Sequence, residues 1–199
     1  MYIHLITTFG PAIAYLLIFA TIFAECGLLV GFFLPGDSLL FGLGILAATH
    51  TLALWPILIA AAIGAISGNI VGYLIGKKAG HSLFSGQHNW LFSQKHLHTA
   101  QAFYAKYGNA TVILSRFVPI VRTFAPVVAG AAEMPYRPFV FYSVIGGLAW
   151  SVVVTILGYY LGQLFPNLDK YVTYVLVAVV LVSFISAARH FVSNSKKAN

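Results

Sequence analysis

Long apolar runs separated by short breaks dominate this sequence. About 20 apolar residues in a helix cross the hydrocarbon core of a bilayer. Four runs reach that length, at residues 12–34, 53–76, 139–164 and 171–191. The pattern predicts an all-α polytopic membrane protein, with residues 1–199 forming a single integral membrane domain.

Two further apolar segments do not fit a complete crossing. Residues 39–48 are too few, and residues 110–130 are interrupted by prolines. The expected breaks lie at Pro35 and Gly36 before the first segment, and at Pro119 and Pro126 within the second. Broken backbone at membrane depth is tolerated only where protein or a water-filled cavity surrounds it. The sequence therefore predicts two re-entrant hairpins in addition to the four spanning helices.

The distribution of positive charge predicts how the chain is oriented. The basic segment 77–106, with four lysines, is placed in the cytoplasm by the positive-inside rule. If both broken segments are hairpins, the N-terminus, Arg137, Lys196 and Lys197 fall on that side as well, and Lys170 alone lies outside. This count favours hairpins that enter from opposite faces. Broken segments in corresponding positions of two halves are typical of an inverted-repeat transporter.

Composition excludes several other classes of protein. The chain is 60% hydrophobic, and only 15 of its 199 residues are charged. The net charge of +7 is dispersed, so no nucleic-acid partner is expected. Cys26 is the single cysteine, which excludes an intrachain disulfide. Four histidines lie in the segment 77–106, but no acid or cysteine joins them, so neither a metal nor a cofactor is expected.

Glycines recur every four residues along the span 53–76. They are Gly64, Gly68, Gly72, Gly76 and Gly80. This spacing places them on one face of a helix, where small residues let another helix approach closely. We predict that Gly68, Gly72 and Gly76 serve helix packing.

Four charged residues fall within the apolar segments: Glu25, Asp37, Arg116 and Arg122. A guanidinium group inside a bilayer costs at least about 2.5–3.5 kcal/mol and stays charged. Six residues separate the two arginines, which would place them on different faces of an unbroken helix. A break at Pro119 allows both to turn toward one point. We expect the two acids and the two arginines to meet in one polar site.

Structural roles for these residues remain open at this stage. Asp37 follows Pro-Gly and has the position of a helix N-cap. Glu25 could form a hydrogen bond to a neighbouring helix. Arg116 could pair with an acid or extend toward the membrane surface.

The charges also indicate a chemistry. Arginine presents a fixed fork of donors that matches phosphate oxygens. A carboxylic acid in a medium of low dielectric constant can exchange protons near neutral pH. Two basic groups with two titratable acids indicate a proton-coupled carrier of an anion or a phospholipid. Arg116 and Arg122 would bind the phosphate, and Glu25 and Asp37 would couple its movement to protons.

At these residues the chain resembles the DedA family of bacterial inner-membrane proteins, which shares its core domain with eukaryotic membrane proteins. The matching pieces are Glu25 with Pro35-Gly36-Asp37, the ladder from Gly68 to Gly76, and the run from Arg116 through Pro119 to Arg122. They cover residues 20 to 160 in the family's order.

The resemblance implies lipid transport that depends on the membrane potential or on protons, in the bacterial inner membrane. Family members are implicated in returning undecaprenyl phosphate across that membrane, and others in moving phospholipid. An enzyme is not expected. Three alternatives stay open: a carrier of small anions or ions, a lipid phosphatase, and a structural membrane protein. The sequence also leaves open whether the chain forms a homo-oligomer.

Overall fold

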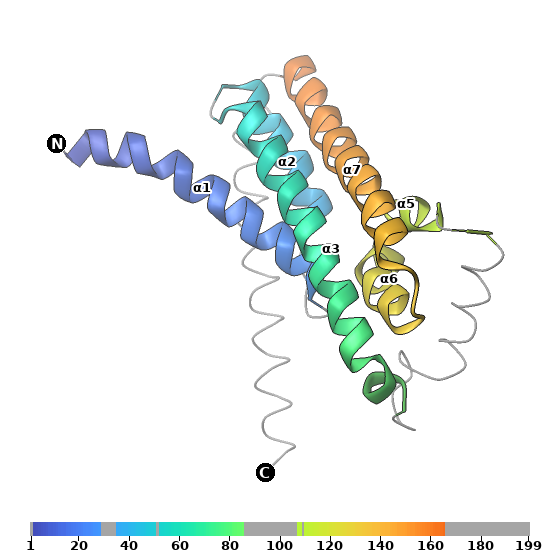
Figure 1. Ribbon diagram of the computed structural model, residues 1–199. Helices are drawn as coiled ribbons and strands as arrows, with labels where there is room; N and C mark the ends of the chain where they lie inside the picture. The colour runs from blue at the N-terminus through green and yellow to red at the C-terminus, as the bar shows by residue number, and fades with distance from the viewer. Residues whose placement is uncertain (1, 29–34, 51, 86–106, 109, 166–199) are drawn as a thin grey trace, which may run out of the picture.

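The computed structural model describes residues 2–28, 35–50, 52–85, 107–108 and 110–165 (Figure 1). Every regular element in these ranges is a helix. The fourth predicted span, residues 171–191, lies outside the described residues, as does most of the segment 77–106.

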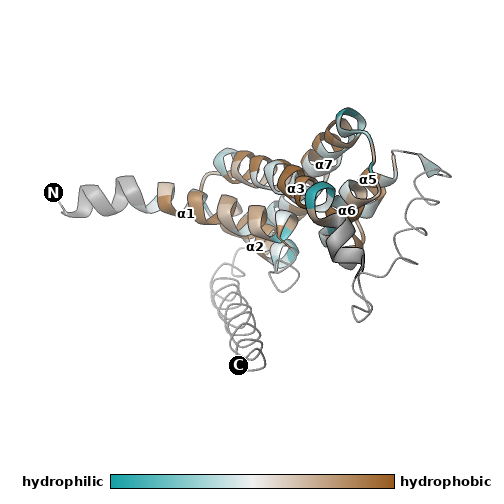
Figure 2. Cartoon of the chain, turned by 60° about the horizontal axis from the view of Figure 1, so that its bottom comes forward, coloured by the Kyte–Doolittle hydropathy of each residue, from teal (hydrophilic) through white to brown (hydrophobic). Residues whose placement is uncertain are grey.

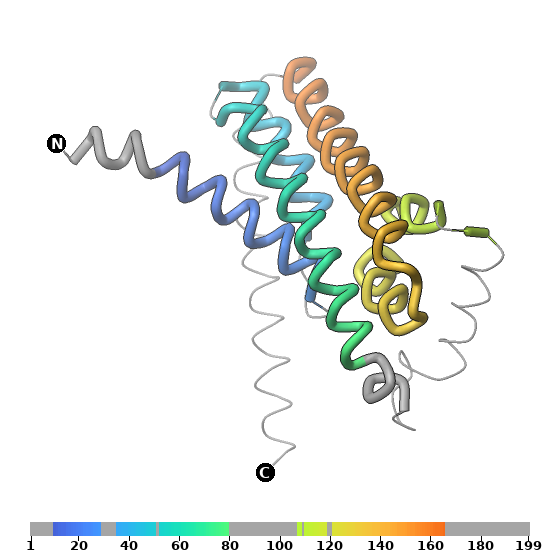
Figure 3. Tube along the Cα trace, viewed as in Figure 1, coloured from blue at the N-terminus to red at the C-terminus, as the bar shows by residue number. Residues whose placement is uncertain are grey.

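Two long helices, α3 and α7, form the centre of the molecule and lie side by side (Figures 1 and 3). Helix α3 is Leu54–Ser85 and helix α7 is Tyr136–Leu164. They run antiparallel, because Asn69 of α3 contacts Ser143 of α7 while Ala65 lies near Gly147. Helix α3 continues nine residues beyond the predicted end at residue 76, into the basic segment 77–106.

Helix α1, Tyr2–Gly27, packs along α3 in the same direction. The hydroxyl of Tyr15 accepts a hydrogen bond from the Ala53 backbone at the start of α3. Further along, the backbone of Phe19 approaches Gly64, and that of Gly27 approaches Gly68. Helix α1 therefore ends beside the middle of α3.

This direction differs from the topology expected from charge. A complete span over residues 12–34 would have placed the N-terminus at the same end of the molecule as Lys77. In the structure, Tyr15 of α1 lies at the Leu54 end of α3, opposite Lys77, and the start of α1 extends away from the other helices (Figure 1). The physical reason is the glycine face of α3, which lets α1 pack closely along it in the parallel sense.

Helix α2, Gly36–Ala48, packs along α7 and is too short to cross a bilayer. Its 13 residues measure about 20 Å at the usual rise of an α-helix. Asp37 at its start contacts Trp150, and Ala48 at its end lies near Gly162, so α2 runs parallel to α7. It is consequently antiparallel to α1.

Residues 110–131 form two helices that meet at a break. Helix α5, Thr111–Ser115, ends in a tight turn, and helix α6, Pro119–Ala131, begins at a proline (Figure 1). Proline suits the first position of a helix because its missing N–H has no partner there. The second break, expected at Pro126, is wrong: α6 continues through that residue. Pro126 instead packs against the bare face of Gly72.

The burial pattern is that of a protein in an apolar solvent. Large apolar side chains on α1, α3 and α7 are exposed, among them Leu16, Ile63 and Phe141. Polar side chains on the same helices face inward, including Asn69 and Ser151. Brown hydrophobic residues accordingly cover much of the helix surface in Figure 2. By length and composition, three of the described helices could cross a membrane, at Gly10–Gly27, Leu54–Ala79 and Tyr136–Leu164.

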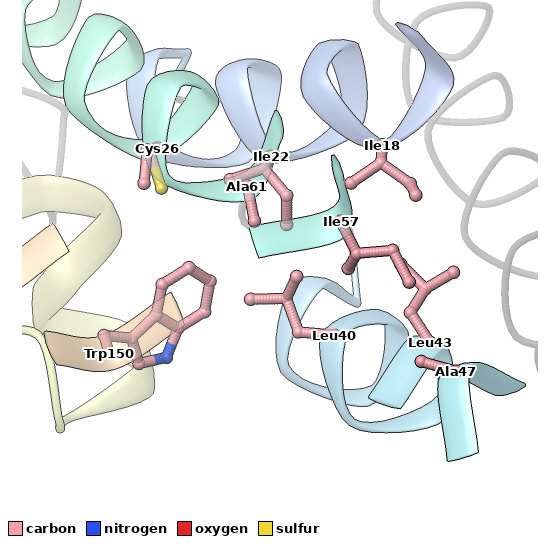
Figure 4. Close-up of a cluster of buried hydrophobic side chains, with 10 residues drawn as sticks. Ile18, Ile22, Cys26, Leu40, Leu43, Ala47, Ile57, Ala61 and Trp150 are labelled. Carbon is pink, nitrogen blue, oxygen red and sulfur yellow. The ribbon is translucent and has the colours of Figure 1, made fainter. Parts of the chain in front are cut away.

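A cluster of buried apolar side chains joins the first three helices to α7 (Figure 4). Ile18, Ile22 and Cys26 come from α1, Leu40 from α2, and Ile57 and Ala61 from α3. Trp150 of α7 lies at one edge of this cluster. The cluster therefore fixes the position of Trp150 relative to all three N-terminal helices.

Glu133 ends α6 in a backbone conformation that favours glycine. Its φ angle is +59°, and the Met134 N–H donates to the Ala129 carbonyl oxygen, as in a Schellman cap. We expect Glu133→Gly to raise the melting temperature of the detergent-purified protein, since a left-handed residue with a Cβ costs about 1–2 kcal/mol. Glu133→Ala keeps the Cβ and is the control. A gain with alanine as large as with glycine would contradict this explanation.

Candidate functional site

Charged and aromatic side chains from four helices meet where the long helices have their midpoints. Trp150 is the middle residue of α7, Tyr136–Leu164. Glu25 lies two residues before Gly27, which contacts the central part of α3. We call Glu25, Asp37, Arg116, Arg122 and Trp150 the central cluster.

Arg122 holds two carboxylates that come from different helices. Its Nη1 donates to Asp37 Oδ1 of α2 at 2.5 Å, and its Nη2 donates to Glu25 Oε1 of α1. The side chains of Arg122 and Glu25 are 7% and 2% exposed. Truncating one partner of a buried ion pair of this kind is strongly destabilising, because it leaves an uncompensated charge. Arg122 thus joins α6 to α1 and α2.

Gly36 lets the Glu25 carboxylate approach the first turn of α2. A Cβ atom on Gly36 would overlap Glu25 Oε2, so no other residue fits this position without movement. The first turn of a helix carries unpaired N–H groups and the positive end of the helix dipole, which stabilise an anion. The Pro35-Gly36 break therefore places the start of α2 against Glu25.

Asp37 also lies in the first turn of α2, but it is not the N-cap. Pro35 takes the cap position and makes no side-chain cap hydrogen bond. The Asp37 carboxylate turns to Arg122 and accepts a second hydrogen bond from Trp150 Nε1 at 2.8 Å. The guanidinium carbon of Arg122 lies 4.7 Å from the centre of the Trp150 ring, a cation–π distance.

Arg116 is buried beside these ion pairs without joining them. It is 3% exposed; its Nη1 lies 3.9 Å from Cys26 Sγ, and its Nη2 lies 3.5 Å from the Ala65 carbonyl oxygen. Among the described residues it forms no salt bridge within 4.0 Å. A buried guanidinium that no carboxylate compensates is energetically unfavourable, so binding of an anion would stabilise it.

The sequence predicted that four charged side chains would meet, and the structure joins three of them directly. Glu25, Asp37 and Arg122 are bonded to one another, while Arg116 lies next to them through Cys26, the residue after Glu25. Gly147, which lies near Arg116 Nη2, is one helical turn before Trp150 on α7. Arg116 therefore lies against α7 one helical turn from Trp150, on the same face of that helix.

Sequence reasoning missed Trp150. An aromatic residue within a membrane span is common, and nothing in the local pattern distinguishes this tryptophan from an apolar core residue. The one available signal is that a buried indole N–H needs an acceptor. An acceptor inside an apolar span points to Asp37 or Glu25.

The predicted packing glycines lie at helix crossings. Gly68 contacts α1, Gly72 contacts α1 and α6, and Gly76 lies against the Val127 backbone of α6. These contacts position α1, which carries Glu25, and α6, which carries Arg122. Among the described residues, no three His, Cys, Asp or Glu side chains lie together as metal ligands would.

The long helices are apolar, and the short helices α2 and α6 begin beside ion pairs at the midpoints of these long helices. This arrangement is that of a multi-pass α-helical membrane protein. The family model of the VTT domain matches residues 6–160 of the chain. The chain belongs to this family, the DedA family of membrane proteins.

Several relatives match over most of their length. Protein DedA of Escherichia coli K12 is 40% identical over 186 residues, which cover 92% of this chain and 84% of the relative. An uncharacterized membrane protein of Mycobacterium leprae is 38% identical, over 89% of this chain and 81% of its own. One from Mycobacterium bovis is 31% identical, over 92% and 85%. No solved structure matches this chain significantly.

Proposed function

We propose that this protein is a transporter of the bacterial inner membrane that moves a phosphate-bearing lipid between leaflets, coupled to protons or to the membrane potential. Undecaprenyl phosphate and phospholipids are the candidate substrates. The observation that carries the proposal is the pair of buried guanidinium groups at the helix midpoints. One of them, Arg122, is bound by two carboxylates, and the other, Arg116, has no paired carboxylate among the residues that the structure describes.

The helix directions support two re-entrant hairpins that enter from opposite faces. The first hairpin, expected over residues 39–48 alone, would instead consist of α1 and α2, entering from the Leu54 end of α3. The second would consist of α5 and α6, entering from the Lys77 end. Lys77, Lys78 and Arg137 lie at the same end, since Gly130 of α6 contacts the Lys77 backbone. The positive-inside rule assigns that end to the cytoplasm.

Matched helix crossings support the inverted repeat. On α2, a side chain at Gly44 would meet the Thr155 carbonyl, and one at Gly158 of α7 would meet the Phe41 carbonyl. On α6, Gly130 faces the Tyr73 carbonyl in the same way, and Gly76 of α3 faces the Val127 carbonyl. In both crossings each glycine contacts the carbonyl three residues before the partner glycine. Each short helix thus packs on the long helix of the other half by the same device.

The charges suggest a transport cycle. A lipid phosphate entering the cluster would bind Arg116, which pairs with no carboxylate in the described part of the chain, and would then compete for Arg122. Protonation of Glu25 would remove one of the charges that hold Arg122. The acyl or prenyl chain would stay in the bilayer, beside the exposed apolar faces of α1 and α3. Release of the proton on the other side would restore the ion pairs.

Reconstitution into liposomes tests this function. The purified protein is placed in vesicles with a fluorescent lipid phosphate, and leaflet exchange is measured by a membrane-impermeant quencher under an imposed pH gradient. Faster exchange than in protein-free vesicles supports lipid transport. Flux of inorganic phosphate without lipid exchange would favour a carrier of small anions, and release of free phosphate from the lipid would indicate a phosphatase.

Glu25→Gln tests the coupling. The change removes a titratable group and keeps the size of the side chain, so we expect transport to be abolished or to lose its dependence on pH. The measurement is the rate of leaflet exchange over a range of pH values. Glu133→Gln, at an exposed acid outside the cluster, is the matched control. A pH profile identical to that of the unmodified protein would remove Glu25 from the coupling role.

A further inference from the structure

One oxygen atom in the central cluster receives two donors from different helices. Arg122 Nη1 of α6 and Trp150 Nε1 of α7 both donate to Asp37 Oδ1, at 2.5 and 2.8 Å. Both donors are buried, since Arg122 is 8% and Trp150 2% exposed as whole residues. Two fixed donors that converge on a single anionic oxygen have the form of an anion-binding site.

The donors are held in place independently of Asp37. The Trp150 ring lies 4.7 Å from the guanidinium carbon of Arg122 and belongs to the apolar cluster of α1, α2 and α3. Arg122 Nη2 is bonded to Glu25 Oε1. If Asp37 moved away, Arg122 would still be fixed by Glu25 and by the indole ring.

Asp37 itself is the least enclosed member of the group. Its side chain is 43% exposed, compared with 7% for Arg122 and 2% for Glu25. In addition, Arg122 Nε is buried and has no hydrogen-bond partner among the described residues. A buried donor left unpaired is unfavourable, so a ligand with more acceptor oxygens than Asp37 presents could bond to this N–H as well.

We propose that Arg122 and Trp150 form one binding site for a phosphoryl anion, and that the Asp37 carboxylate occupies this site in the resting state. Phosphoryl oxygens accept from guanidinium and N–H donors in the same way as carboxylate oxygens. A phosphate has more acceptor oxygens than the single Oδ1 that Asp37 presents to both donors. It would displace Asp37, bond to Nη1 and to the indole N–H, and leave Glu25 on Nη2.

The position of Arg116 extends this site. Gly147 lies near Arg116 Nη2 and is one turn before Trp150 on α7. A phosphate beside Trp150 is therefore one helical turn from the second guanidinium. Trp150 would act as a ligand-binding residue in its own right, and Asp37 as a built-in competitor of the substrate. This inference rests on the proposed function, since it specifies how the same cluster holds its substrate.

Equilibrium binding of radiolabelled inorganic phosphate to the detergent-purified full chain tests the site. We expect Asp37→Ala to bind phosphate about tenfold or more tightly than the unmodified protein, because the internal competitor is gone. Adding Trp150→Phe to Asp37→Ala removes the N–H but keeps an aromatic ring, and should weaken binding by about tenfold. Trp55→Phe, at an exposed tryptophan at the start of α3, is the matched control and should change nothing.

Asp37→Asn keeps the size of the side chain and guards against a folding defect in the alanine variant. It should shift phosphate affinity in the same direction. Affinity in both Asp37 variants equal to or weaker than that of the unmodified protein would overturn the proposal. So would an Asp37→Ala protein whose affinity does not respond to Trp150→Phe.

Competition identifies the source of the phosphoryl group, and transport separates this inference from the proposed function. A short-chain phosphatidic acid should displace the labelled phosphate at lower concentration than unlabelled phosphate does if the ligand is a lipid headgroup; equal displacement assigns the site to free phosphate. Lipid exchange by the unmodified protein without tighter binding in the variants would reject only the Asp37 site. Tighter binding without lipid exchange would reject only the transport function.

Discussion

Arg122→Lys is expected to lower the rate of lipid exchange at least about tenfold while the protein still inserts into the membrane. Lysine keeps the charge but offers a single ammonium group in place of a planar fork. In the structure, the two Nη atoms of Arg122 bind carboxylates on two different helices, and its guanidinium carbon lies 4.7 Å from the centre of the Trp150 ring. A lysine would satisfy these partners incompletely, and one lost charge-assisted hydrogen bond corresponds to about 1.5–3 kcal/mol.

The measurement is leaflet exchange in liposomes, normalised to the amount of folded protein recovered by gel filtration. Arg137→Lys, at an exposed arginine near the start of α7, is the matched control and should leave the rate unchanged. Exchange by the Arg122→Lys protein at the unmodified rate would show that charge alone is needed. In that case the paired hydrogen bonds from Arg122 to Glu25 and Asp37 would have no role in transport.

Gly76→Ala is expected to cause a large loss of stability, by about 1–3 kcal/mol, the usual cost of forcing extra atoms into a packed core. A Cβ at this position would overlap the carbonyl oxygen of Val127, which belongs to the backbone of α6 and cannot rotate away. Helices α3 and α6 would have to separate. Since α6 carries Arg122, the central cluster would be displaced as well.

Thermal unfolding in detergent, followed by loss of the monodisperse gel-filtration peak, measures this effect. Gly10→Ala is the matched control, because a Cβ there meets no atom within 4 Å. In a helix that change should be neutral or stabilising by up to about 1 kcal/mol. Equal melting temperatures for the two variants would contradict close packing at Gly76.

The sequence predicted the chemistry of the site better than its geometry. Glu25, Asp37 and Arg122 could be selected because charged side chains are costly in an apolar segment, and a cost of that size needs a reason. Which arginine takes the carboxylates could not be predicted, since Arg116 and Arg122 flank Pro119 symmetrically. The choice depends on how α6 packs against α3, which places Arg122 toward α1 and α2.

The expected topology shows the same limit. Charge counting treated residues 12–34 as a complete span, because their length and composition allow it. In the structure, α1 packs parallel to α3 and ends at its middle. That arrangement depends on contacts between Gly27 and Gly68, which are 41 residues apart in the chain. Likewise, Pro126 reads as a helix break, but α6 retains its helix through it, and the ring packs on Gly72.

The sequence by itself determined that this is a helical membrane protein, where its backbone breaks near Gly36 and Pro119, and which charged residues lie within its apolar segments. Each of these follows from local properties: the length of apolar runs, the missing N–H of proline, and the cost of a charge in hydrocarbon. Only the tertiary structure decided that Arg122 binds both acids, that Arg116 pairs with no acid in the described ranges, and that Trp150 donates to Asp37 Oδ1. Those facts depend on the packing of helices that are distant in the chain, which no local pattern records.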